Sequence, residues 1–88
     1  MVAQLPHEPG VYQFLDRSGK IIYVGKAKDL RKRVSSYFVE NRDHSAKVIV
    51  LVRQVVDIRH IVVGSEQDAL LLENSLIKSL QPRYNILL

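Results

Sequence analysis

The stretch that decides the fold is VYQFLDRSGKIIYV, residues 11–24. Two runs rich in β-branched and aromatic residues, 11–15 and 21–24, enclose a short polar connection that contains Gly19. Such residues favour strands, and a short polar link with glycine favours a tight reversal of the chain. The sequence therefore predicts a β-hairpin whose second strand is ended by Gly25.

Two helices are predicted after the hairpin. Asp29 is of a type that caps helix starts. The residues behind it place apolar side chains on one face at the helical period: Leu30, Val34, Tyr37 and Phe38. A second helix is predicted from Asp43 or Ser45 to Val56, although the β-branched run 48–52 would also suit a buried strand.

A strand and a third helix complete the chain. Residues 57–63 alternate polar and apolar side chains and then become apolar, as in a strand that lies partly on a core. Ser65 and Asp68 stand at capping-box spacing, and a leucine-rich face follows until Pro82 ends the helix. The order β-β-α-α-β-α predicts a single α+β domain over residues 1–88, with a small, mainly antiparallel three-stranded sheet flanked by helices.

Composition excludes several classes of protein. With 47% hydrophobic and 25% charged residues the chain should fold, and 88 residues are too few for two independent cores. The absence of cysteine excludes disulfides and thiolate metal sites. The longest apolar run, 48–52, is far shorter than the ~20 residues that span a bilayer, and the N-terminal residues lack a secretory pattern. A cytoplasmic location is therefore expected.

Positive charge is concentrated in one part of the sequence. The net charge is +4, and residues 17–33 contain seven of the 13 cations with Asp29 as the only acid. These cations are Arg17, Lys20, Lys26, Lys28, Arg31, Lys32 and Arg33. Such a patch suits a polyanionic partner. A solvated helix face that carries cations for solubility fits the charge pattern equally well.

Two charged residues lie where chemistry, rather than solubility, could require them. Glu73 falls on the leucine-rich side of the last helix, where a carboxylate must be protonated, paired with a cation or bound to a metal. Arg33 lies at the edge of an apolar helical stripe, and its guanidinium fork suits two phosphate oxygens. For each, the alternative is a side chain whose stem packs on the apolar surface while its charge reaches water.

Tyr23 is a candidate proton acceptor. Lys26 follows it closely, and a nearby cation lowers the pKa of a phenol. Gly25, between them, has no Cβ and would let a nucleotide backbone approach closely. The three histidines share no metal-binding spacing and are interpreted as structural or surface residues: His7, His44 and His60.

Five motifs follow one another along the chain: GVY at 10–12, YVGKAK at 23–28, Arg33 with Tyr37 and Phe38, LLLE at 70–73 and PRYN at 82–85. Together they resemble the GIY-YIG nuclease family, most closely its UvrC-type N-terminal domains. The resemblance extends from Leu5 to Leu88 and rests on the joint order of these motifs. Val11 and Val24 replace the isoleucines of the family name, which are conservative apolar changes on strands.

The resemblance implies an endonuclease that hydrolyses one DNA phosphodiester with a single divalent metal ion, Mg²⁺ or Mn²⁺. By resemblance, Glu73 is the metal ligand, Arg33 binds the scissile phosphate and Tyr23 is the general base. The supporting active-site positions are Tyr12, Lys26, Tyr37 and Asn85. Further contacts to DNA phosphates are expected from Lys28, Arg31 and Lys32.

For UvrC-type members, the resemblance implies the 3′ incision of nucleotide excision repair. The expected partners are damaged double-stranded DNA and UvrB, with UvrA acting upstream, and the chain is expected to be an N-terminal fragment of a longer protein. Because only one carboxylate occupies a matched position, a two-metal mechanism is not expected. Two alternatives remain: a DNA-binding module that does not cleave by itself, and a shorter, stand-alone UvrC-like nuclease.

Overall fold

The computed structural model describes residues 2–39 and 44–87. Its elements are η1 (Val2–Gln4), β1 (Gly10–Leu15), β2 (Ile21–Ala27), α1 (Leu30–Phe38), α2 (Ala46–Gln54), β3 (Asp57–Val62), α3 (Glu66–Leu80) and α4 (Arg83–Leu87). The predicted α+β order is confirmed, with the short helices η1 and α4 added at the two ends. None of the helices in these residues has the length and apolar character needed to cross a membrane.

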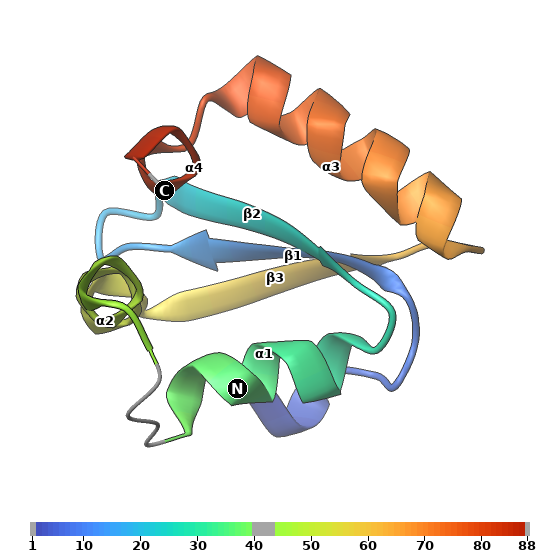
Figure 1. Ribbon diagram of the computed structural model, residues 1–88, viewed down its shortest axis with the longest axis horizontal. Coiled ribbons are helices and arrows are strands. Elements are labelled where there is room, and N and C mark those ends of the chain that lie inside the picture. The colour runs from blue at the N-terminus through green and yellow to red at the C-terminus, as the bar shows by residue number, and fades with distance from the viewer. Residues whose placement is uncertain (1, 40–43, 88) are drawn as a thin grey trace.

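The three strands form one antiparallel sheet in the order β2-β1-β3 (Figure 1). The hairpin between β1 and β2 turns through hydrogen bonds between Asp16 and Lys20, and Gly19 has the positive φ of 82° that the turn requires. β1 is central and wholly buried. β2 and β3 are therefore the two edges of the sheet.

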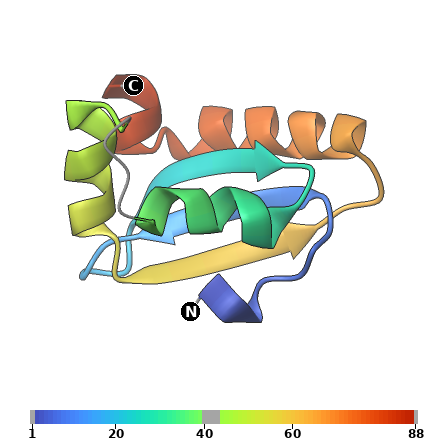
Figure 2. The same ribbon diagram turned by 60° about the horizontal axis from the view of Figure 1, so that its bottom comes forward.

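Alternation along β1 divides the core between the two faces of the sheet. Tyr12 and Phe14 face one side, where they pack in a cluster with residues of α1, α2 and α4. Val11 faces the other side and packs with Val24 and with Ala69 of α3. Successive strand residues point to opposite faces, so one strand supplies both layers. Figures 1 and 2 show α3 on one side of the sheet and α1 on the other.

The predicted helix caps of α1 and α3 are confirmed, and the structure settles the start of α2. The Asp29 carboxylate accepts a hydrogen bond from the amide of Lys32, and the Ser65 hydroxyl accepts one from the amide of Asp68. The cap of α2 is Ser45, whereas the other proposed start, Asp43, lies outside the described residues. These side chains satisfy amides that a helix start otherwise leaves without a partner.

Some predicted boundaries were wrong. Gly25 does not end β2, which continues to Ala27, because Gly25 is paired with Tyr12 in the ladder. α2 ends at Gln54 rather than Val56, whose amide instead donates to the carbonyl of Leu15. The helix predicted for the run 48–52 is confirmed, and strand β3 ends one residue before the predicted position 63.

Helix α4 had no sequence signal. Gln81 adopts the left-handed conformation, with φ 47°, and ends α3 one residue before Pro82. The chain then forms a five-residue helix that is too short to show an apolar period. α4 packs against β2 and brings Asn85 to the edge of the sheet.

A candidate active site at the edge of strand β2

The residues predicted as catalytic come together around the free edge of β2. Helices from both faces of the sheet, α1 and α3, pack against this strand, and α4 covers the same strand farther along. The contributing residues are Tyr12 on β1, Tyr23 on β2, Arg33 and Tyr37 on α1, Glu73 on α3 and Asn85 on α4. An edge strand flanked by three helices therefore holds side chains that are up to 73 positions apart in the sequence, from Tyr12 to Asn85.

A hydrogen-bonded network links Tyr12, Tyr37 and Arg33. The hydroxyls of Tyr12 and Tyr37 lie 2.8 Å apart in the core, and Nη2 of Arg33 donates to the Tyr37 hydroxyl over 3.3 Å. The guanidinium carbon of Arg33 lies 5.1 Å from the centre of the Tyr37 ring, one turn farther along α1. Burial, with the adjacent Tyr37 hydroxyl, raises the pKa of Tyr12, which therefore remains protonated. The network fixes the direction of the arginine.

Tyr23 is half-buried beside this network. Its ring centre lies 6.3 Å from that of Tyr12 and 6.4 Å from that of Tyr37. Burial raises the pKa of Tyr23 to about 12; the Tyr37 hydroxyl adds to the increase, Arg33 opposes it, and the negative charge of Glu73 adds to it again. The Tyr23 hydroxyl is thus within electrostatic reach of both the arginine and the carboxylate.

The prediction that Lys26 lowers the pKa of Tyr23 was wrong. The cation that opposes the increase is Arg33. The reason lies in the register: Tyr23 pairs with Phe14, whereas Lys26 pairs with Val11, so the two side chains project from opposite faces of the sheet. Residues three apart on a strand always diverge in this way.

Glu73 is half-buried on the face of α3 that packs against the sheet. In residues 2–39 and 44–87 it forms no ion pair; the two that occur there join His7 to Asp29 and Lys28 to Glu66. No group of three or more His, Cys, Asp or Glu side chains in these residues could enclose a metal ion. A divalent cation held by Glu73 would fill its other positions mainly with water and phosphate oxygens, a pattern typical of Mg²⁺.

Asn85 binds the backbone of β2. Its Oδ1 accepts a hydrogen bond from the amide of Val24 over 2.8 Å, and its Nδ2 donates to the Val24 carbonyl over 2.9 Å. These groups lie beside Tyr23 on a strand that has no neighbour on that side. Asn85 therefore supplies the pairing that an edge strand lacks, and its predicted part in catalysis remains a prediction.

Gly25 is explained by a neighbouring side chain. A Cβ at this position would overlap the ring and hydroxyl of Tyr12. The space that was predicted to admit a nucleotide is thus occupied by a tyrosine on that side of the strand. The glycine allows Tyr12 to lie flat over β2 and reach Tyr37.

A basic hollow of about 550 Å³ adjoins the site between the end of β2 and α1. It is lined by Lys26, Ala27, Lys28, Asp29, Lys32, Arg33 and Ser36. Lys28 also lies 3.5 Å from Glu66 in an exposed ion pair, which holds it only weakly. Two of the three predicted phosphate contacts, Lys28 and Lys32, therefore share a hollow with Arg33.

The third predicted phosphate contact, Arg31, is placed differently. It is half-buried, and its Nε donates to the carbonyl of Leu5 over 2.6 Å. Conversely, the sequence interpretation missed Ser36, which lines the hollow and donates from its hydroxyl to the Arg33 carbonyl over 2.6 Å. The helical spacing of Ser36 from Lys32 and Arg33 could have indicated it.

Comparison with known proteins identifies the family of this chain. The family model described as a UvrC-like GIY-YIG domain matches residues 8–86. UvrABC system protein C of Flavobacterium psychrophilum is 66% identical over 87 residues, which are 99% of this chain and 14% of the relative. The protein of the same name from Bacteroides thetaiotaomicron is 61% identical over 89 residues, which cover 100% of this chain and 14% of the relative. The chain thus spans about a seventh of the length of these relatives.

A solved structure is also similar. The GIY-YIG N-terminal endonuclease domain of UvrC from Thermotoga maritima, bound to its catalytic magnesium, matches with a TM-score of 0.82 and 38% identity. The match covers 94% of this chain and 89% of that domain. Point mutants of the Thermotoga maritima domain, including a tyrosine-to-phenylalanine and an asparagine-to-alanine change, were also solved with the divalent cation bound. By family model, sequence identity and structure alike, this chain belongs to the family of UvrC-like GIY-YIG domains.

Proposed function

We propose that this domain is an endonuclease that hydrolyses one phosphodiester bond of DNA with a single divalent metal ion, Mg²⁺ or Mn²⁺. The observation that carries the proposal is the meeting of three groups at the edge of β2. The pKa of Tyr23 is affected by both the Arg33 guanidinium and the Glu73 carboxylate. These two charges come from helices on opposite faces of the sheet. A proton acceptor, a cation and a metal ligand are the three functions that hydrolysis of a phosphodiester needs.

Arg33 would bind the scissile phosphate. Its guanidinium offers paired N–H donors that match two phosphate oxygens, and Tyr37 holds the side chain in place by a hydrogen bond. The adjoining hollow extends the positive surface through Lys26, Lys28 and Lys32. These lysines would contact phosphates next to the cleaved bond and position the strand without reading its bases.

Tyr23 would accept the proton of the attacking water. At neutral pH its phenol is protonated, because its pKa is about 12 and Glu73 contributes to that increase. Glu73 would hold the divalent cation, which would supply Lewis acidity for the phosphate. Neutralising the Glu73 charge in this way would remove one cause of the raised pKa of Tyr23 and so favour its phenolate. Tyr12, Tyr37 and Asn85 would hold the phenol and the guanidinium in their relative positions.

For the protein that contains this domain, we propose the 3′ incision of damaged double-stranded DNA in nucleotide excision repair. The support is the family and the name of its relatives, UvrABC system protein C. UvrB, loaded through UvrA, would deliver the DNA. Recognition of the damage would be left to these partners, because the lysines of the hollow would contact phosphates and would not read bases.

The proposal is tested with the full-length protein that carries this domain, UvrA, UvrB and a duplex with one lesion. With Mg²⁺ we expect a cut on the 3′ side of the lesion that chelation of the metal abolishes. Glu73→Gln should lower the rate at least ~10³-fold, because the only carboxylate ligand is lost while the side-chain volume is kept. The matched control is Asn74→Ala on the exposed face of α3, which should cut normally.

Undiminished metal-dependent cutting by Glu73→Gln would refute the metal assignment. Binding of DNA that falls with salt, without cutting under any of these conditions, would identify the domain as a binding module instead.

A further inference from the structure

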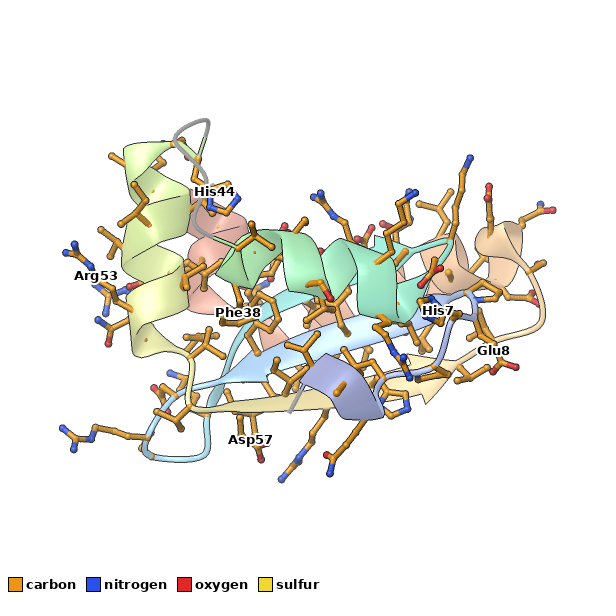
Figure 3. The ribbon with its side chains drawn as sticks, turned by 90° about the horizontal axis from the view of Figure 1, so that it is seen from below. His7, Glu8, Phe38, His44, Arg53 and Asp57 are labelled. Atoms are coloured by element: carbon orange, nitrogen blue, oxygen red, sulfur yellow. The ribbon has the colours of Figure 1, made fainter. Side chains whose placement is uncertain are left out.

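The N-terminal segment, residues 2–9, runs alongside helix α1 rather than away from the domain. Leu5 is only 2% exposed and belongs to the same core cluster as Leu30 and Val34 of α1. η1 packs against α1, and Figure 3 shows His7 beside the start of this helix. The segment is thus a packed part of the domain, although it contains neither a strand nor a predicted site residue.

Its backbone carbonyls bind the first turn of α1. The amide of Leu30 donates to the Glu8 carbonyl over 2.9 Å, and the amide of Arg31 donates to the Pro6 carbonyl over 3.2 Å. The side chain of Arg31 adds the 2.6 Å hydrogen bond from Nε to the Leu5 carbonyl. Three consecutive contacts therefore join the segment to two adjacent helix residues.

A pair of side chains also joins the N-terminal segment to the start of α1. Nδ1 of His7 lies 2.8 Å from the carboxylate of Asp29, and this carboxylate also accepts a hydrogen bond from the amide of Lys32. With the amides of Leu30 and Arg31 bound to carbonyls, and that of Lys32 bound to Asp29, the first amides of α1 are all occupied. The start of α1 is therefore tied to the protein and has no free amide for a phosphate.

We infer that residues 5–9 form a clamp that sets the position of α1, and that Arg31 is a positioning residue for Arg33 rather than a contact to DNA. The inference rests on the proposed function. Residues two apart lie on different sides of a helix, and here Arg31 bonds to the clamp while Arg33 bonds to Tyr37. Arg31 is also absent from the residues that line the basic hollow.

Through its effect on Arg33, Arg31 would influence the rate of cutting, because a phosphate-binding side chain must be placed accurately. A displacement of about 1 Å at the reacting groups can cost ~10²-fold in rate. Loss of the Arg31 side-chain bond would loosen the start of α1, while the two backbone hydrogen bonds to the segment and the buried leucine and valine stay in place. The expected result is a slower chemical step at unchanged DNA affinity.

The test compares Arg31→Gln with Lys32→Gln in the full-length protein, with UvrA, UvrB and a damaged duplex. Both variants lose one positive charge at neighbouring positions of α1. For Arg31→Gln we expect the single-turnover cutting rate at saturating DNA to fall about 10- to 100-fold, with unchanged DNA affinity and salt dependence. For Lys32→Gln we expect weaker DNA binding, with a salt slope smaller by about one unit.

If Arg31 instead contacts a DNA phosphate, Arg31→Gln should change DNA affinity and salt slope rather than the cutting rate. If Arg31→Gln weakens binding and reduces the salt slope as Lys32→Gln does, but cuts normally at saturating DNA, the clamp is refuted. Circular dichroism at the assay temperature confirms that each variant is folded. A folded His7→Ala protein, which keeps Arg31, should show the same pattern as Arg31→Gln but with a smaller loss, about 2- to 5-fold.

A structural readout separates this inference from the proposed function. The Nε–H signal of Arg33 can be followed by ¹⁵N NMR in the 88-residue chain, because the similar Thermotoga maritima domain was crystallised at nearly this length. Arg31→Gln should shift and broaden the Arg33 signal, and Lys32→Gln should not. If the wild-type protein does not cut DNA, the proposed function fails, yet an unchanged Arg33 signal in Arg31→Gln would still refute the clamp.

Discussion

The two edges of the sheet differ in almost every respect. The β2 edge is flanked by α1 and α3 from opposite faces and by α4 along its free side, where Asn85 occupies the backbone of Val24. The β3 edge is bare: of its six residues only Ile58 is half-buried, and the other five are exposed. Every predicted catalytic residue except Tyr12, on central β1, lies on β2 or on a helix that packs against β2.

This difference shows how a small domain makes a site. A half-buried phenol or carboxylate needs partners, and a place where several elements converge can supply them. At β2 the rings of Tyr12, Tyr23 and Tyr37 pack together, and charged groups of two helices, Arg33 and Glu73, both affect the pKa of Tyr23. At β3 no such convergence exists in the part of the chain that the structure describes. We therefore expect substitutions at the two edges to have very different effects.

After Glu73→Gln, the largest effect is expected for Arg33→Gln. Loss of the guanidinium removes positive charge from the phosphate in the transition state, for which a fall of about 10²- to 10³-fold in single-turnover rate is typical. The thermal midpoint should change little, because the Arg33 side chain is exposed and has one long hydrogen bond at 3.3 Å. A rate within threefold of wild type would contradict the assignment of Arg33.

Gly25→Ala should mainly affect stability. The new Cβ would overlap the Tyr12 ring, and overpacking of this kind costs about 1–3 kcal/mol in the free energy of unfolding. The thermal midpoint of a domain of this size should fall by roughly 4–8 °C per kcal/mol. Gly64→Ala is the matched control, since its Cβ would meet only Asp68 at an ordinary 3.5 Å. Equal midpoints for the two variants would show that Tyr12 does not require the glycine.

The pH dependence of cutting should report the ionisation of Tyr23. The pKa of Tyr23 is raised to about 12 without metal, and a cation on Glu73 would lower it; below that lowered pKa the phenolate is a minor species that grows about tenfold per pH unit. The single-turnover rate should therefore increase with pH between about 7 and 9, and folding should weaken above about pH 10, where only the unfolded phenol ionises readily. Tyr23→Phe should lower the rate and abolish the slope; a slope that persists in this variant would exclude Tyr23 as the base.

Tyr37→Phe should have a moderate effect on both properties. It removes the hydroxyl that joins Tyr12 to Arg33 while keeping the ring, so it should cost about 1 kcal/mol of stability. Arg33 would then be less well directed, and we expect the rate to fall about 3- to 10-fold. Tyr84→Phe, at another tyrosine of the same core cluster, is the control and should cut normally.

The smallest effect is expected at β3. Arg59→Gln changes an exposed residue of the bare edge and should alter the free energy of unfolding by less than about 0.5 kcal/mol. Cutting rate and DNA affinity should stay within twofold of wild type. A loss of affinity comparable to that of Lys32→Gln would show that DNA also contacts β3 and would remove the contrast between the edges.

Local patterns predicted the elements well where they repeat over several turns. The caps at Asp29 and Ser65 and the apolar face of α1 each depend on neighbours in sequence, and all were found. Ends and short pieces were missed because tertiary contacts decide them. β2 continues past Gly25 because Tyr12 pairs there, and α4 forms beside β2 without any periodic signal of its own.

The sequence named the residues of the candidate site, whose roles remain predictions, but the electrostatics that it suggested were wrong. Tyr23, Arg33 and Glu73 were identified from residue type, helical position and resemblance, and the structure places them around one strand edge. The partner of Tyr23 was mistaken for Lys26, which is close in sequence but faces the opposite side of the sheet. Nearness along a strand is a poor guide to nearness of side chains, because residues an odd number of positions apart point to opposite faces of the sheet.

The amino-acid sequence by itself determined the hairpin, the three main helices and the family, because strand composition, helix caps and motif order are properties of short stretches. Only the tertiary structure decided which charged groups affect the pKa of Tyr23. It also decided that Asn85 binds the free edge of β2, and that Arg31 and Arg33 have different partners. Burial, register and the packing of one helix against a distant segment set these features. They depend on residues far apart in the chain, so no local pattern contains them.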